Sequence, residues 1–232
     1  MLEEILPWER DLFLLLNSPH TPFFDNFMWL YSQIWSWLPF YIVLFGILVY
    51  KKTWKESLLI IAAIILLVLL CDQISSHICK PYFHRFRPTH HPDFENIVKT
   101  VFGYRGGSYG FISGHATNSF GFAVFLSLVF RNKYLTFILF LFASINAYSR
   151  IYLGVHFISD IVAGAIVGSI IGFLVYKLYM FARKKFLKNP RRGYKPLLYT
   201  PQQSAILIIT YLILVFCYSF FGEQIVELVR GI

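Results

Sequence analysis

The chain has 232 residues, of which 57% are hydrophobic, 19% aromatic and only 14% charged. This balance excludes an ordinary soluble domain and indicates a protein that crosses a membrane several times. The formal net charge of +9 would suit nucleic acid or a membrane surface, so the basic residues must first be assigned to a side of the membrane.

The N-terminal segment, residues 2–16, is apolar but short, and it carries Glu9, Arg10 and Asp11. A membrane span needs roughly 20 apolar residues, so this segment is too short and too charged to cross. We expect a helix that lies in the membrane interface. A partly ordered surface tail is the alternative. A signal peptide is not favoured, because acids precede the first cation.

Six stretches are apolar enough to be membrane spans. Their expected bounds are 29–50, 58–79, 113–130, 134–149, 157–180 and 204–221. The fourth is short, so five spans are an alternative. The expected fold class is all-α: a single integral membrane domain, residues 1–232, built as a bundle of about six transmembrane helices with an N-terminal interfacial helix.

Most of the lysines and arginines lie in three short links between the predicted spans. The sequences KKTWKE at 51–56, RNK at 131–133 and ARKKFLKNPRRGYK between the last two spans contain three, two and seven of them. All three links fall on one side if every span crosses, and the positive-inside tendency makes that side cytoplasmic. The acidic N-terminus, the link 80–112 and the link around 150–156 fall on the opposite, outer side.

Six cations nevertheless occur on the outer side. A cluster of cations there indicates an anionic ligand, although loop cations can also pair with nearby acids or lipid phosphates. The six are Lys80, Arg85, Arg87, Lys99, Arg105 and Arg150.

Two outer segments suit a phosphate group. Lys80 and Arg87 offer a point charge and a planar fork for separate phosphate oxygens. Ser113 and Gly114 stand at a helix start, where free backbone amides and the helix dipole favour an anion. Together these residues predict a phosphate cradle, although a helix cap is the usual reason for a serine at this position.

Two histidines on the same side suit catalysis. His156 and Asp160 are four residues apart, so on a helix the carboxylate can hold one ring nitrogen and leave the other free to attack. His115 then acts as the acid that protonates a departing oxygen. A local hydrogen bond would also explain the His–Asp pair, but polar groups at membrane depth are rare unless they line a cavity or pathway.

Ten positions in these segments together resemble the three-part signature of the type 2 phosphatidic acid phosphatase superfamily. One departure is Ile112, where the family commonly has proline before the Ser-Gly-His triplet. The matching positions are Lys80-x6-Arg87-Pro88, then Ser113-Gly114-His115, then Ser149-Arg150-x5-His156-x3-Asp160.

The resemblance implies a division of roles. His156 becomes transiently phosphorylated, Asp160 orients it, and His115 protonates the leaving group before it activates the hydrolytic water. The family scheme needs no metal and no cofactor. The residues implied to bind the phosphoryl group are Lys80, Arg87, Arg150, Ser113 and Gly114.

A site at the lipid boundary favours a membrane lipid as substrate. We expect the enzyme in a bacterial cytoplasmic (inner) membrane, with its active site facing the periplasm or cell exterior and with no nucleic-acid partner. The extra cations Arg85, Lys99 and Arg105 suggest headgroup contacts with several negative charges. That favours lipid A phosphates slightly over undecaprenyl diphosphate.

Other functions fit the same residues. Phosphatidylglycerophosphate and phosphatidic acid are alternative substrates. A vanadate-dependent haloperoxidase shares the anion-binding signature, although the many spans argue against it. A phospholipid-binding or transport protein could use the pocket without hydrolysis.

Two further patterns concern packing. Gly164, Gly168 and Gly172 repeat every four residues, so we expect the fifth predicted span to pack closely against a neighbour, with a dimer interface as the alternative. Asp72 and Ser76 precede Lys80 at helical spacing. They indicate either a water-filled extension of the site or hydrogen bonds between helices.

Overall fold

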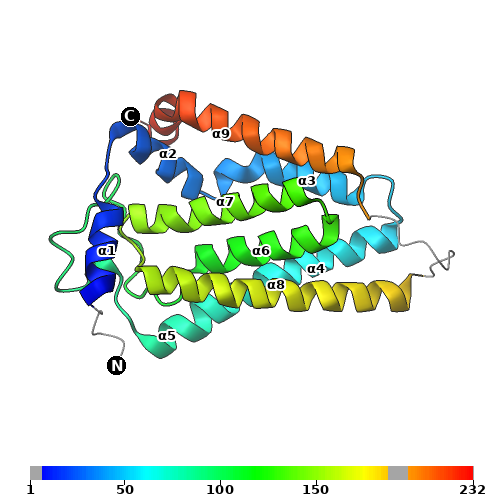
Figure 1. Cartoon of the computed structure of the whole chain (residues 1–232), viewed down its shortest axis with the longest axis horizontal. Helices are drawn as coiled ribbons and strands as arrows, with labels where there is room; N and C mark the ends of the chain where they lie inside the picture. The colour runs from blue at the N-terminus through cyan, green and yellow to red at the C-terminus, as the bar shows by residue number, and fades with distance from the viewer. Residues whose placement is uncertain (1–6, 188–197, 232) are drawn as a thin grey trace.

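The computed structural model describes residues 7–187 and 198–231, and within these ranges helices dominate and no β-strand is present. The all-α fold class is therefore confirmed. Figure 1 shows the long helices side by side, with α1 lying across one end of the bundle. The helices are α1 (Pro7–Asn17), α2 (Pro22–Ser32), α3 (Leu38–Val49), α4 (Trp54–Asp72), α5 (Lys80–Phe83), α6 (Gly114–Phe130), α7 (Lys133–Tyr152), α8 (Ile158–Phe186) and α9 (Pro201–Arg230).

Four continuous helices are long and apolar enough to cross a membrane, which makes the chain a multi-pass membrane protein. They are Trp54–Phe83, Lys133–Tyr152, Ile158–Phe186 and Pro201–Arg230. The predicted fourth span, which looked short in sequence, is thus a full 20-residue helix. A bent pair of helices brings the number to five, and α6, with 17 residues, is a shorter apolar helix.

The expected first span, 29–50, is wrong as one continuous helix. Gln33 is extended, and the chain bends by 76° between α2 and the helical segment Trp35–Val49. Backbone groups at membrane depth need internal partners, and here side chains supply them. The Trp37 indole donates to the Tyr31 carbonyl at 2.9 Å, and Asn146 donates to the same oxygen at 3.3 Å. The break is therefore stabilised by tertiary contacts.

Between α4 and α5 the helix continues as a π-helical stretch, Gln73–Cys79. The whole unit runs from Trp54 to Phe83, well beyond the expected 58–79. π-Helical turns inside α-helices are frequent at functional sites. Here the stretch ends directly before Lys80.

The predicted close packing of the fifth span is confirmed, and its partner is α6 of the same chain. A side-chain Cβ at Gly164 would lie 2.7 Å from the Ser113 carbonyl oxygen. Cβ atoms at Gly168 and Gly172 would overlap the backbone carbonyls of Thr117 and Gly121. The glycines therefore allow backbone contact between α6 and α8, and α6 also packs against α4 and α7 (Figure 1).

We expect the substitution Gly168→Ala to lower the melting temperature in detergent by about 5 °C or more, because overpacking a tight contact outweighs the better helix propensity of alanine. Gly46→Ala is the control, since Gly46 in α3 has open space where the methyl group would lie. Equal melting temperatures for the two variants would contradict the close approach of α6 and α8.

The N-terminal helix packs on the loop 84–113, the end of α7 and the start of α8. Phe13 of α1 is fully buried, with its ring centroid 5.8 Å from that of Phe94 and 5.2 Å from that of Phe157. Leu15 and Trp8 remain exposed. Residues 2–6 of the predicted interfacial helix lie outside the described residues.

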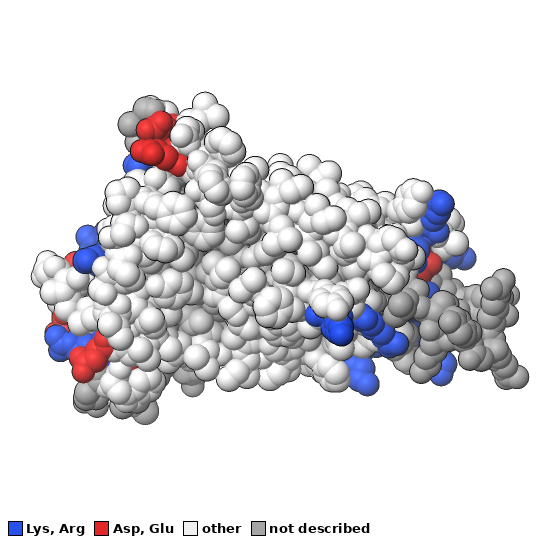
Figure 2. Space-filling view, turned by 45° about the horizontal axis from the view of Figure 1, so that its top comes forward, with Lys and Arg blue, Asp and Glu red and all other residues white. Residues whose placement is uncertain are grey.

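Charged side chains separate along the bundle. Figure 2 shows Lys and Arg at the end where α8 finishes, acids and further cations at the opposite end, and a wide belt between them without charged side chains on this face. The links 51–53 and 131–132 lie at the first of these ends, together with the end of α8 (Figure 1). These three links therefore share one side, as the sequence predicts; residues 188–197 of the third link lie outside the described residues.

Candidate phosphate-binding site

Residues from the three signature segments meet at the end of the bundle opposite the basic links. The loop 84–113 folds over the start of α6, while the end of α7 and the start of α8 close the site from the other side. The carbonyl of Asp160 in α8 accepts a hydrogen bond of 3.0 Å from the Ser113 amide at the start of α6. Helices α6 and α8 are therefore joined at the site by a backbone hydrogen bond.

His156 has an arrangement that defines its reactive nitrogen. Its Nε2 lies 3.0 Å from Arg87 Nη1, and its Nδ1 lies 3.4 Å from Asp160 Oδ2. Because a guanidinium group can only donate, Nε2 must be the acceptor and carry no proton. The proton then belongs on Nδ1, facing the carboxylate. The nitrogen with a free lone pair is thus the one that faces the cations.

The surroundings of His156 keep the ring neutral. Its side chain is buried, and this burial, together with the positive charges of Arg87, Arg150 and Lys80, holds its pKa well below the ordinary histidine value. Both effects disfavour an added positive charge. A neutral imidazole is the form that a nucleophile requires.

Asp160 is buried and surrounded by donors. One carboxylate oxygen, Oδ2, accepts from the Phe157 amide at 3.0 Å and faces His156, while Oδ1 accepts from Arg85 at 2.8 Å. Gly110 lies against this pair, since a Cβ there would be 3.1 Å from Asp160 Oδ2. A carboxylate held on both oxygens has little freedom to turn away from the histidine.

Arg87 and Arg150 are two buried arginines at the candidate site. Arg87 also donates to the Val155 carbonyl at 3.0 Å, and Arg150 donates to the Tyr104 hydroxyl at 3.1 Å. The Nε atoms of both arginines are buried without a hydrogen-bond partner. Burial and the positive charge of Arg150 lower the pKa of Arg87 below its usual value. Each guanidinium group therefore keeps one buried donor, its Nε, without a hydrogen-bond partner in the structure.

Lys80 completes the set of cations through a chain of polar contacts along its own helix. Its ammonium group donates to Ser76 Oγ at 3.3 Å, and Ser76 donates to Asp72 at 3.1 Å. The ammonium nitrogen is 4.0 Å from the Cβ position of Gly114, at the start of α6. The predicted stripe of Asp72, Ser76 and Lys80 is thus a hydrogen-bonded chain along one helix that aims Lys80 at the α6 N-terminus.

Ser113 is the N-cap of α6, and its hydroxyl accepts from the Ala116 amide at 3.4 Å. The first amides of a helix have no partner within the helix, so the amides of Gly114 and His115 stay available to an anion. Gly114 also allows close approach, because a Cβ there would lie 3.2 Å from Ser75 Oγ. Ser113 therefore caps the start of α6, and Gly114 has no side chain that would block access to it.

His115 bonds across to α2. Its Nε2 lies 3.3 Å from the Ser32 carbonyl, and the positive charge of Arg150 acts on its ring. The Ser32 carbonyl is available because α2 ends there. The break between α2 and α3 thus fixes the position of the second histidine.

The three phosphate-site cations share a property that decides what can bind. Lys80, Arg87 and Arg150 form no salt bridge with a carboxylate in the ranges 7–187 and 198–231, whereas the neighbouring Asp160 is already paired with Arg85. Buried cations are costly without an anionic partner. An anion in contact with all three would offset this cost.

Three further cations were expected to contact the substrate headgroup, but in the structure they have partners within the protein. These are Arg85, Lys99 and Arg105. The guanidinium of Arg85 is 5% exposed and bound to Glu9 and Asp160, so it is not free to contact a headgroup. Lys99 donates to the Ser18 carbonyl at 2.8 Å, and Arg105 donates to the Thr89 carbonyl. Lys99 and Arg105 are exposed surface residues.

Sequence reasoning missed two side chains at the site. Tyr104 bonds Arg150, and its ring centroid lies 5.4 Å from that guanidinium. Glu9 is buried and bonds Arg85. A signal for Glu9 was present, since at helical spacing it shares a face with the buried Phe13, and an acid on the apolar face of a helix needs a partner.

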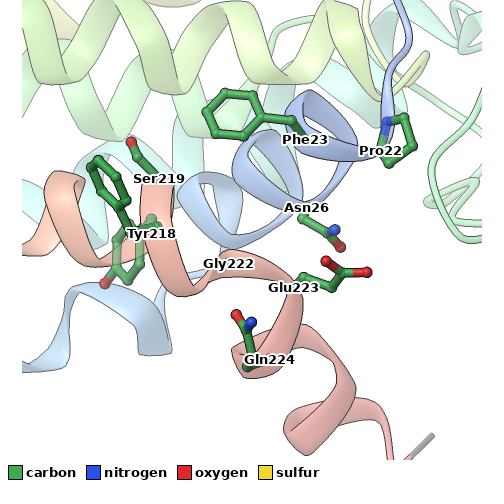
Figure 3. A pocket seen from close by; sticks show the side chains of 9 residues that line it. Pro22, Phe23, Asn26, Tyr218, Ser219, Gly222, Glu223 and Gln224 are labelled. Carbon is green, nitrogen blue, oxygen red and sulfur yellow. The ribbon is translucent and has the colours of Figure 1, made fainter.

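An open hollow of about 400 Å³ leads to the candidate site. Two of the site's cations, Lys80 and Arg87, line it together with His84 and Tyr109. A second hollow, of about 210 Å³, lies between α2 and α9. Figure 3 shows Asn26 and Glu223 on its facing sides. None of its nine lining residues is a lysine or arginine, so only the first hollow suits a phosphate group.

Comparison with known proteins agrees with this geometry. The chain matches the PAP2 superfamily over residues 57–184. Lipid A 4'-phosphatase from Porphyromonas gingivalis is 44% identical over 229 residues, which are 99% of this chain and 97% of that protein. Lipid A 4'-phosphatase from Bacteroides thetaiotaomicron is 38% identical over 177 residues, 76% of this chain and 79% of the relative. The crystal structure of Aquifex aeolicus LpxE is similar with a TM-score of 0.58 and 27% identity, covering 76% of this chain and 99% of that chain.

Proposed function

Because the chain belongs to the PAP2 superfamily, we propose that it is a membrane phosphatase that removes a phosphate group from lipid A. The observation that carries the proposal is the set of three cations, without a carboxylate partner among the described residues, around an unprotonated imidazole nitrogen. Lys80, Arg87 and Arg150 supply the charge, and His156 supplies the lone pair. An anion-binding site with a nucleophile at its centre suits phosphoryl transfer.

The first step follows from this arrangement. His156 Nε2 attacks phosphorus, a P–N bond forms, and the bond from phosphorus to the lipid oxygen breaks. The cations and the amides at the start of α6 stabilise the charge on the phosphoryl oxygens. His115, in the protonated form that the negative charge of a bound phosphate favours, gives a proton to the departing lipid oxygen. Asp160 stabilises the positive charge that develops on His156.

The second step returns the protein to its starting state. His115, now neutral, takes a proton from a water molecule whose oxygen attacks phosphorus. The P–N bond breaks, and inorganic phosphate leaves with the lone pair restored to Nε2. His156, His115 and Asp160 are the proposed catalytic residues, and neither step requires a metal or a cofactor.

Lipid A is favoured over other phospholipids by the near full-length similarity to a lipid A 4'-phosphatase. The opening of about 400 Å³ beside Lys80 and Arg87 leaves room for a group attached to the phosphate. Residues such as His84, Ser108 and Tyr109 line it.

The proposed location is a bacterial inner membrane with the site on the periplasmic side. Support comes from the charge asymmetry, because cations at short links mark the cytoplasmic side. The links 51–53 and 131–132, which carry lysine and arginine residues, lie at the end of the bundle away from the site (Figure 1).

A panel of purified lipids in one detergent tests the proposal. We expect inorganic phosphate to be released from lipid A at least about 10-fold faster, by kcat/KM, than from phosphatidic acid, phosphatidylglycerophosphate or undecaprenyl diphosphate. A 10-fold preference corresponds to about 1.4 kcal/mol of differential transition-state binding. Equal rates across the panel would contradict the substrate assignment, and binding without any phosphate release would contradict the phosphatase.

A further inference from the structure

A buried chain of charges connects the N-terminal helix to the histidine. Glu9 Oε2 lies 3.0 Å from Arg85 Nη2, and Arg85 Nη1 lies 2.8 Å from Asp160 Oδ1. Asp160 in turn faces His156 Nδ1. The side chains of Glu9, Arg85 and Asp160 are 4%, 5% and 0% exposed, so water screens none of these contacts.

Each member of the chain has further bonds that fix its direction. Arg85 Nη1 also donates to the Ser159 hydroxyl, and the guanidinium lies 4.8 Å from the ring centroid of Phe157. The second oxygen of Glu9, Oε1, accepts from the Ser159 amide at 2.8 Å. Glu9 therefore holds both Arg85 and the first turn of α8.

Arg85 is the cation that lies between two buried carboxylates, Glu9 and Asp160. Without Arg85, two buried carboxylates would face one another with no cation between them, which is strongly unfavourable. Without Glu9, Arg85 would keep Asp160 as its one acidic partner and would lose a hydrogen bond that sets its orientation. Asp160 must stay ionised and directed at His156 for the ring to keep its proton on Nδ1.

We infer that Glu9 and Arg85 are positioning residues for catalysis, Arg85 holding Asp160 charged and directed at His156, and Glu9 holding Arg85. This inference rests on the proposed phosphatase function. Neither residue contacts the phosphate site itself. The short N-terminal helix α1 therefore has a part in catalysis, because it supplies Glu9.

Two variants test the inference in the full-length protein. Arg85→Met and Glu9→Gln are expected to lower kcat for lipid phosphate about 10-fold to 100-fold, the size of effect seen when a residue that orients a metal-bound histidine is lost. KM should change little, because Lys80, Arg87 and Arg150 are untouched. Arg85→Lys should recover part of kcat, since it restores the cation without the fork.

Binding of two anions separates positioning from general damage. Inorganic phosphate needs only the cations, whereas orthovanadate, an analogue of the transition state, also needs a correctly directed His156 nitrogen. We expect both variants to bind phosphate within about 2-fold of wild type and vanadate about 10-fold more weakly, a loss of about 1.4 kcal/mol. If phosphate and vanadate affinity fall together, or neither falls, the inference is wrong.

A double variant and a control complete the test. If Glu9 acts through Arg85, then Glu9→Gln in the Arg85→Met background should cost far less than it does alone. If the effects of the two substitutions on kcat were fully additive, Glu9 would not act through Arg85. Asp11→Asn is the matched control, because Asp11 lies on the same helix but is exposed. A wild-type protein that releases no phosphate from any lipid would refute the proposed function, while the vanadate comparison would still decide this inference.

Discussion

Replacing His156 by alanine should reduce phosphate release from lipid A by about 10⁴-fold or more, because the proposed reaction loses its nucleophile. The unprotonated Nε2 lies 3.0 Å from Arg87, and this is the nitrogen that faces the phosphate-site cations. Steady-state release of inorganic phosphate measures the effect. Acid quenching with labelled substrate should also show that the covalent phosphoprotein of the wild type is missing from the variant.

The control is His77→Ala, which removes a histidine whose side chain is 62% exposed, on the helical unit that ends at Phe83. Its activity should stay within about 2-fold of wild type, as for most surface substitutions. Turnover by His156→Ala at more than about a tenth of the wild-type rate would exclude the phosphohistidine mechanism. Thermal melting in detergent checks that both variants are folded.

Replacing Arg150 by methionine should lower kcat/KM by about 10³-fold, because a buried, preorganised positive group is lost from the phosphoryl oxygens. Arg150 is 2% exposed, and its Nε has no hydrogen-bond partner in the structure. Its other known contact, the Tyr104 hydroxyl at 3.1 Å, is neutral. The guanidinium is therefore free to bind an anion. Competition by inorganic phosphate should weaken in parallel with the loss of activity.

The matched control is Arg131→Met at the opposite end of the bundle. Arg131 is exposed and donates to the Tyr176 hydroxyl at 3.1 Å. It should leave kcat/KM within about 2-fold of wild type. If Arg150→Met retained its affinity for inorganic phosphate, Arg150 would not be a phosphate ligand, and the proposed division of the cations would fail.

Much of the fold could be predicted from the sequence, but continuity of the helices could not. Hydropathy located the apolar stretches, because the length of a span follows from membrane thickness, but it missed some helix ends; α9, for example, ends at Arg230 and not at 221. The bend at Gln33 was missed, because the Tyr31 carbonyl beside it accepts from Trp37 and from Asn146, and Asn146 is far along the chain. The local sequence pattern does not predict hydrogen bonds from residues far along the chain.

The candidate site shows the same division. Spacing predicted that His156 and Asp160 would meet, but on a shared helical face. In the structure His156 precedes α8, which begins at Ile158, and Asp160 reaches back from the first turn to the Phe157 amide and His156. Arg85, by contrast, was expected to contact a headgroup, and it is bound between Glu9 and Asp160, 76 and 75 residues away. A cation's partner is set by how helices pack, so charge and position in the sequence could not distinguish a free arginine from a paired one.

The sequence by itself determined that this protein is a membrane protein, which links share a side, and that the residues of a phosphate-handling signature lie at span ends. These follow from composition and short-range spacing. Only the tertiary structure decided which ring nitrogen of His156 is unprotonated, which cations lack a carboxylate partner, and that α1 reaches the site through Glu9. Each of these depends on distances between side chains from different helices, and packing alone sets those distances.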